Sequence, residues 1–237
     1  MAGGTGVEEG DEDVAHGPIL PYPRRVPAVV FDFDGLMIDS ESEVAACVAE
    51  VLAERGLALP LEDVAHLFGS TDTQAEWDRV LAPHGLSLAA LRPSVDAILH
   101  PRLDALPLLP GVVEVLDAAE SAGWGTAIAT GTDRPRLLAH LARLGLEDRF
   151  DVLVTRPEVE QGKPAPDIYL EAASRLGTRA EECLALEDSL PGCAAALAAG
   201  MRVIVCPSPV TARCAFPVDV PRVASLVEVV SLLVAPR

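Results

Sequence analysis

The sequence predicts an α/β protein built around a parallel β-sheet. From about residue 110 to 206, short apolar runs rich in β-branched residues alternate with longer amphipathic stretches. Strands that alternate with helices in this way form parallel sheets that are covered on both faces. The chain has 237 residues, which is enough for one large domain or for a domain with a small insertion.

The first strand is predicted in the run VVFDFDG at residues 29–35, which contains Asp32 and Asp34. Side chains two positions apart in a strand point to the same side. An unpaired charge in a buried strand costs on the order of 20 kcal/mol in the idealised limit. We therefore expect the two aspartates to share one site, with a cation compensating their charge.

A helical region is predicted to follow this strand. Ser40 and Glu43 fit a capping box that opens a helix, and Gly56 fits the end of that helix. From about 57 to 106 the apolar spacing indicates several short helices and no convincing strand. We therefore predict that residues 44–106 form an all-helical domain, inserted after the first strand.

The rest of the chain is predicted to complete the sheet and its helical layers. We expect helices at about 112–121, 135–144, 167–176 and 190–199, and strands at about 125–130, 151–155, 183–186 and 202–206. The predicted α/β core therefore comprises residues 27–43 and 107–237. Residues 1–26 combine glycines, prolines and a short acidic block, which is typical of a disordered acidic tail.

Composition excludes several classes of function. The net charge of −18, from 18 basic and 36 acidic residues, argues against binding to nucleic acid, which needs clustered Lys and Arg. No apolar run approaches the roughly 20 residues of a membrane span, and the start of the chain lacks the pattern of a secretory signal. The five cysteines are scattered and form no CxxC pair, which favours a reducing cytoplasm over disulfides or a zinc site.

Polar and acidic residues follow several of the predicted strands. Thr130 and Gly131 end one strand, Glu187 and Asp188 end another, and Lys163 lies between them in the sequence. Ligands of open α/β sheets bind beyond the carboxyl ends of the strands, so these groups should meet the first acid pair there. Crowded carboxylates need a hard cation, and ligands that are all oxygen favour Mg²⁺.

The residue types at this edge suit phosphoryl transfer. One carboxylate can act as a nucleophile that forms an aspartyl phosphate, and a second can act as general acid and base. A threonine hydroxyl, a glycine amide and a lysine can bind the phosphoryl oxygens. We expect a small phosphorylated metabolite as the partner.

Four sequence strings resemble the haloacid dehalogenase (HAD) superfamily, in its branch of phosphatases and β-phosphoglucomutase-like enzymes with a helical cap. The strings are VVFDFDGLMIDSE (29–41), AIATGTD (127–133), GKPAPDIYLEAASRLG (162–177) and LALEDSLPGCAAALAAGM (184–201). They occur in the order that the family has, and the resemblance covers about residues 27–206. It implies a Rossmann-like parallel sheet core with an inserted helical cap, a Mg²⁺ cofactor and a phosphoaspartyl intermediate.

The resemblance also implies roles for single residues. Asp32 would be the nucleophile and a metal ligand, and Asp34 the general acid and base, with its backbone carbonyl on the metal. Thr130, with Gly131 beside it, and Lys163 would bind the transferring phosphoryl group. Asp188 would be a metal ligand, and Glu187 a ligand directly or through water. The implied function is Mg²⁺-dependent hydrolysis of a small phosphomonoester such as a sugar phosphate or a nucleotide.

Two alternative functions remain open. A β-phosphoglucomutase-like sugar phosphomutase would need cationic cap residues for a second phosphate, and segment 66–74 has no Arg or Lys, although Arg79 or Arg92 could serve. A receiver-like signalling phosphoacceptor uses similar residues but lacks a helical insertion. Ser70, Thr71, Gln74 and Trp77 are candidates for the substrate-binding part of the cap, with Trp77 favoured as a core residue. The state of assembly, monomer or small homo-oligomer, stays open.

Overall fold

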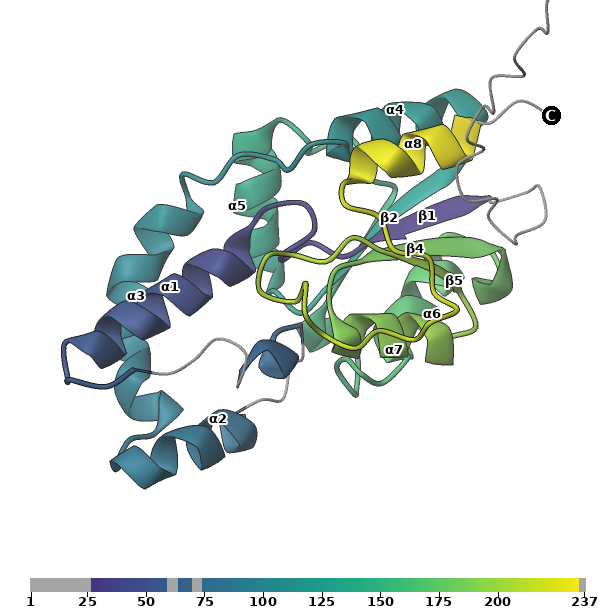
Figure 1. Ribbon diagram of the computed structural model, residues 1–237. Coiled ribbons are helices and arrows are strands. Elements are labelled where there is room, and N and C mark those ends of the chain that lie inside the picture. Colours follow the sequence, from purple (N-terminus) through teal and green to yellow (C-terminus); the bar gives the residue numbers. More distant parts are fainter. Residues whose placement is uncertain (1–26, 59–63, 70–73, 235–237) are drawn as a thin grey trace, which may run out of the picture.

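A five-stranded parallel sheet forms the centre of the molecule (Figure 1). The computed structural model describes residues 27–58, 64–69 and 74–234. The strands are β1 (Ala28–Phe31), β2 (Gly125–Thr130), β3 (Val152–Thr155), β4 (Cys183–Glu187) and β5 (Arg202–Val205). They lie in the order β3-β2-β1-β4-β5, and every neighbouring pair is parallel. The predicted α/β fold with a parallel sheet is therefore confirmed.

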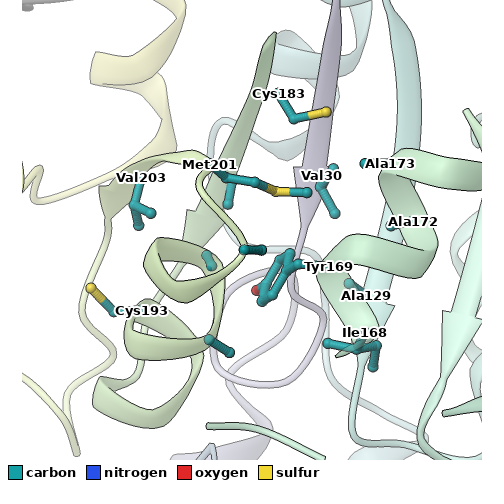
Figure 2. Close-up of a cluster of buried hydrophobic side chains, with 14 of the residues drawn as sticks. Val30, Ala129, Ile168, Tyr169, Ala172, Ala173, Cys183, Cys193, Met201 and Val203 are labelled. Carbon is teal, nitrogen blue, oxygen red and sulfur yellow. The ribbon is translucent and has the colours of Figure 1, made fainter. Parts of the chain in front are cut away.

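Helices cover both faces of the sheet. One face packs against α6 (Asp167–Arg175) and α7 (Leu190–Ala198). Figure 2 shows buried side chains from the sheet and from these helices that pack together. The other face packs against α4 (Val112–Ala122), α5 (Arg134–Leu144) and α8 (Leu226–Val234), and Figure 1 shows α4 beside α8. Strands buried on both faces carry apolar residues at nearly every position, which explains their continuous apolar runs.

The central strand shows how the two apolar layers form. In β1, Val30 belongs to the cluster beneath α6 and α7, whereas Phe31 belongs to the cluster beneath α4, α5 and α8. This alternation follows from the two-residue period of a strand. Phe31 is fully buried and meets the ring of Phe150 edge-on at 5.7 Å between centroids.

A third apolar cluster lies among the helices inserted after β1. It joins α1 (Ser40–Ala53), α2 (Gln74–Leu81) and α3 (Leu88–Leu103), with α1 and α3 in extensive contact. Short 3₁₀ helices occur at Ala65–Leu67, Ala82–His84, Arg156–Glu158 and Ala180–Glu182. The separate cluster supports our proposal that residues 44–106 are a cap, with the core in 27–43 and 107–237.

Two local expectations are wrong. The strand β1 ends at Phe31, so Asp32 and Asp34 lie in the loop beyond it. The cap of α1 is Asp39, whose carboxylate accepts a hydrogen bond from the Ser42 amide, and the hydroxyl of Ser40 bonds to Asp34 instead.

The helix α8 has no counterpart among the predicted elements. Its apolar residues Leu226, Val229, Val230 and Leu233 recur at helical spacing, and this face packs on α4.

Within the described residues, no helix combines the length and the apolar character needed to cross a membrane.

Phe31→Ala should destabilise the protein by about 3–5 kcal/mol, because it removes a buried ring and leaves a cavity in the central strand. Urea denaturation followed by circular dichroism measures the loss. The exposed Leu138→Ala on α5 is the control and should change the free energy of unfolding by less than about 0.5 kcal/mol.

A second prediction concerns Glu158, which follows β3. It accepts hydrogen bonds from the amide and hydroxyl of Thr155 and pairs with Arg175 at 2.9 Å. Although partial burial opposes the shift, the hydrogen bonds from Arg175 and Thr155 lower its pKa to about 2. A carboxyl whose pKa is depressed on folding contributes stability above its ordinary pKa and loses it as pH falls through the folded value.

Glu158→Gln should therefore lower the stability at pH 7, and the deficit should shrink as the pH falls from 4.5 towards 2. Urea denaturation across this range tests the expectation, with the exposed Glu147→Gln as control. A deficit that stays constant with pH would contradict it.

Candidate active site

The carboxyl ends of three neighbouring strands meet at one edge of the sheet. Asp32 follows β1, Thr130 is the last residue of β2, and Glu187 is the last residue of β4. Because β1 pairs with both β2 and β4, these residues are adjacent in space. The Asp32 amide also donates to the carbonyl of Leu186 at 3.0 Å, which continues the pairing one residue beyond β1.

Lys163 lies buried at the centre of this edge. Its ammonium contacts Asp32 Oδ1 at 2.5 Å and Glu187 Oε1 at 2.7 Å, and it lies 5.2 Å from the ring centroid of Tyr169. The peptide bond between Lys163 and Pro164 is cis. Burial by itself would lower the pKa of Lys163, but the two carboxylates raise it above its usual value. Lys163 is therefore held as a cation between two acids.

Glu187 is fixed by donors to both of its oxygens. Oε1 accepts from Lys163 and from the Tyr169 hydroxyl, while Oε2 accepts from the Asp188 and Ser189 amides and from the Ser189 hydroxyl. A Cβ at Gly192, in the first turn of α7, would collide with this carboxylate. The site therefore requires glycine there, and Glu187 orients Lys163 towards Asp32.

The carboxylate of Asp188 is much less well supplied with hydrogen-bond donors than that of Glu187. It is fully buried, and among the described residues neither of its carboxylate oxygens has a donor other than the carboxyl group of Glu41, which can donate when it is protonated. Burial, followed by the charge of Glu41, raises the pKa of Asp188. Burial and neighbouring acids likewise raise the pKa of Asp32, against the opposing effect of Lys163. A buried carboxylate with so few donors is costly unless a cation accompanies it.

A divalent cation fits this arrangement. Asp32, Glu187 and Asp188 each offer an oxygen, and these oxygens lie within 4.8 Å of one another. Hard oxygen ligands of this kind suit Mg²⁺, which takes few protein ligands and keeps positions for water and phosphate. The free oxygens of Asp188 are the most direct indication, since Glu187 is already saturated with protein donors.

Asp34 lies beside this cluster and is surrounded by hydroxyl groups. Ser40 donates to its Oδ1 at 2.8 Å, and Thr130 and Thr132 donate to its Oδ2 at 3.3 and 2.5 Å. The Thr130 hydroxyl, which we predicted to bind phosphate, bonds to Asp34 in this structure. Gly131 is exposed directly after β2. The three hydroxyls hold Asp34 in one orientation at the same edge as Asp32.

Glu41 is a further acid that the sequence reading did not select. It lies in the first turn of α1 and is 4% exposed. Burial raises its pKa to about 8, against the opposing effect of hydrogen bonding with Asp188 and Ser208. Gly35 has φ +83° and lies against both acids. A Cβ at this position would overlap the Asp188 carboxylate and come within 3.0 Å of the Glu41 carboxyl carbon.

The structure describes two of the four cap residues that the sequence suggested for substrate binding, Trp77 and Gln74. Trp77 is buried against Phe68, with ring centroids 6.2 Å apart, so the favoured reading of Trp77 as a core residue is confirmed. Gln74 is exposed and donates to Asp78 at 2.9 Å. Ser70 and Thr71 lie outside the described residues. The preceding Gly69 lies close to Ser189, because a Cβ there would overlap its hydroxyl, so the cap reaches the active edge at this glycine.

The sequence reading missed Glu41, Ser40, Thr132 and Tyr169 as members of the site. Glu41 and Ser40 stand inside the string at 29–41, and Thr132 inside the string at 127–133. Thr132 lies just beyond β2, and Ser40 and Glu41 open α1, so their polar character inside these strings was the available signal. Tyr169 carried no such signal, because an aromatic residue in a predicted helix is usually a core residue.

Comparisons with known proteins agree with this geometry. The family model described as haloacid dehalogenase-like hydrolase matches residues 26–200. Hexitol phosphatase B of Escherichia coli (strain K12) is 32% identical over 208 residues, covering 80% of this chain and 87% of that protein. Fructose-1-phosphate phosphatase YqaB of the same strain is 32% identical over 195 residues, covering 76% and 96%.

A solved structure is also similar. The crystal structure of CbbY from Rhodobacter sphaeroides in complex with phosphate superposes with a TM-score of 0.68 at 28% identity, covering 86% of this chain and 96% of that chain. The fold, the matching family model and these relatives agree on a core sheet that carries a hydrolase site.

Asp188→Asn should raise the melting temperature of the metal-free protein, because an amide removes a buried charge that has no donor other than Glu41 and can itself donate to neighbouring carboxylates. The same variant should lose most of the rise in melting temperature that Mg²⁺ produces in the unaltered protein. Differential scanning calorimetry with and without Mg²⁺ measures both effects.

The exposed Asp148→Asn is the matched control for this change and should behave as the unaltered protein does. A Mg²⁺-dependent stabilisation that survives Asp188→Asn would show that the cation is held elsewhere.

Proposed function

Because the chain belongs to the haloacid dehalogenase-like hydrolases, we propose that it hydrolyses a small phosphomonoester through a phosphoaspartyl intermediate on Asp32, with Mg²⁺ as cofactor. The arrangement of Asp32 is the observation that supports this most. Its Oδ1 contacts Lys163, and it lies within reach of two further carboxylates that could share a cation. Asp34, the second acid, stands two residues away at the same edge.

In the first half of the reaction, a carboxylate oxygen of Asp32 attacks phosphorus and the bond to the leaving oxygen breaks. Asp34 gives its proton to that oxygen, so that a neutral alcohol departs. Lys163, already a cation beside Asp32, stabilises the charge on the transferring phosphoryl group. Thr130, which ends β2, and the amide of Gly131 would bind the same oxygens.

In the second half, Asp34 takes a proton from water, and the water oxygen attacks the phosphorus of the aspartyl phosphate. The bond to Asp32 breaks and inorganic phosphate leaves. The hydroxyls of Ser40, Thr130 and Thr132 all donate to Asp34. These hydrogen bonds hold the Asp34 carboxyl group in one orientation.

The cation would be held by Asp32, Asp188 and the backbone carbonyl of Asp34, with Glu187 contributing through water because both of its oxygens already accept protein hydrogen bonds. When bound, Mg²⁺ would neutralise part of the charge on the carboxylates and on the phosphoryl group.

We further propose that the substrate is a sugar phosphate or a sugar-alcohol phosphate. Both named relatives, hexitol phosphatase B and fructose-1-phosphate phosphatase, carry substrates of this class in their names. The cap approaches the active edge at Gly69. Ser70 and Thr71, selected from the sequence alone, stay candidates for contact with the sugar.

Asp32→Asn should reduce phosphate release on the order of 10⁴-fold or more, since an amide cannot act as the nucleophile. The assay measures phosphate released from hexitol phosphates, fructose 1-phosphate, nucleotides and phosphoglycolate in the presence of Mg²⁺. Circular dichroism shows whether the variant is folded. Substantial phosphatase activity in a folded Asp32→Asn protein would refute the mechanism.

The same panel distinguishes the alternatives. A phosphomutase would convert β-glucose 1-phosphate into glucose 6-phosphate without net release of phosphate, and a signalling phosphoacceptor would become labelled once and stop. Continuous release of phosphate, fastest with a sugar or sugar-alcohol phosphate, is the expected result.

A further inference from the structure

We propose that Glu41 is an outer carboxylate of the divalent-cation site, which holds Asp188 in place and increases the affinity of the site for the cation. The inference rests on the proposed Mg²⁺ site and adds a residue to it. It begins from Asp188, because the two oxygens of this fully buried carboxylate have no donor among the described residues other than the carboxyl group of Glu41.

Glu41 faces Asp188 without a positive partner of its own. Within the described part of the chain, the ion pairs at this edge join Lys163 to Asp32 and to Glu187, and none includes Glu41. Its hydrogen-bond donor from the protein is the Ser208 hydroxyl, at 3.1 Å. A buried acid placed beside another buried acid lowers the stability of the fold unless the pair shares a proton or has a cation beside it.

The loop after β5 ties Glu41 and Asp188 together. Ser208 donates to Glu41, the Ser208 amide donates to Thr211 Oγ1 at 3.0 Å, and the Thr211 hydroxyl donates to the Asp188 carbonyl at 2.6 Å. Ser208 and Thr211 are both buried. This chain of hydrogen bonds fixes the distance between α1 and the end of β4, where the two carboxylates meet.

Glu41 does not belong to the set of acids that could touch one ion together. That set contains Asp32, Glu187 and Asp188. We therefore place Glu41 one step away from the ion, where its carboxyl group contacts and orients Asp188. Partners of metal ligands that act at this distance typically change the affinity for the metal by 10- to 100-fold.

Gly35 makes this approach possible. With φ at +83° and no Cβ, it leaves room for the Asp188 carboxylate and for the Glu41 carboxyl group at the same place. The loop from Asp32 to Ser40 therefore brings both the nucleophile and this additional acid to the cation site.

Isothermal titration calorimetry with Mg²⁺ alone, without substrate, tests the proposal. Glu41→Gln keeps the shape and removes the ionisable carboxyl group, and it should weaken Mg²⁺ binding by about 10-fold or more. The matched control is Glu43→Gln, in the same turn of α1 but partly exposed and 3.7 Å from Arg102. This control should bind Mg²⁺ as the unaltered protein does.

Ser208→Ala provides a second variant that leaves every carboxylate in place. It should weaken Mg²⁺ binding in the same direction by a smaller factor, and it tests the proposal if Glu41→Gln does not fold. Unchanged affinity in folded Glu41→Gln and in Ser208→Ala would overturn the inference. Failure of the unaltered protein to bind Mg²⁺ would instead overturn the cofactor of the proposed function.

Discussion

Repulsion among buried carboxylates is the constraint on which the active edge depends. Asp32, Glu187, Asp188 and Glu41 are all buried there, and Lys163 is the cation that contacts two of them. Each acid is compensated differently. Asp32 and Glu187 share the lysine, and Glu187 gains further donors from the backbone and from hydroxyl groups. Asp188 has the least compensation, so its oxygens are the ones that a divalent cation could take.

The rest of the fold supplies the rigidity that such a site needs. The sheet is packed on both faces, and the functional groups lie at the ends of its central strands, so small movements of the loops are limited by the core. Gly35 and Gly192 occur where a side chain would displace a carboxylate. The cap contributes a separate apolar cluster and approaches the edge at Gly69. The core therefore determines the chemistry, while the cap is the part that would distinguish one phosphorylated metabolite from another.

Much of the fold could be predicted from the sequence because the relevant signals are local. The alternation of apolar strands with amphipathic helices indicates burial on both faces. The last four predicted strands agree with the structure within about one residue at each end, whereas the first ends earlier than predicted. The errors occur where contacts between distant parts of the chain determine the local structure. Ser40 is a good capping residue by type, yet its hydroxyl is taken by Asp34 and Asp39 caps the helix instead. The helix α8 has apolar residues at helical spacing, but its contact with α4 is between distant parts of the chain.

The candidate site, too, could be predicted in part from local sequence signals and depends in part on contacts between distant residues. The residue types at the strand ends, together with the four sequence strings, were enough to select Asp32, Asp34, Lys163 and Asp188 as members of one site, because parallel strands bring their carboxyl ends together. Only the tertiary structure decided how each acid is compensated. The Ser208–Glu41 hydrogen bond joins positions 167 residues apart. A contact between positions so distant leaves no periodic trace in the sequence, since it depends on which loops the completed sheet places side by side.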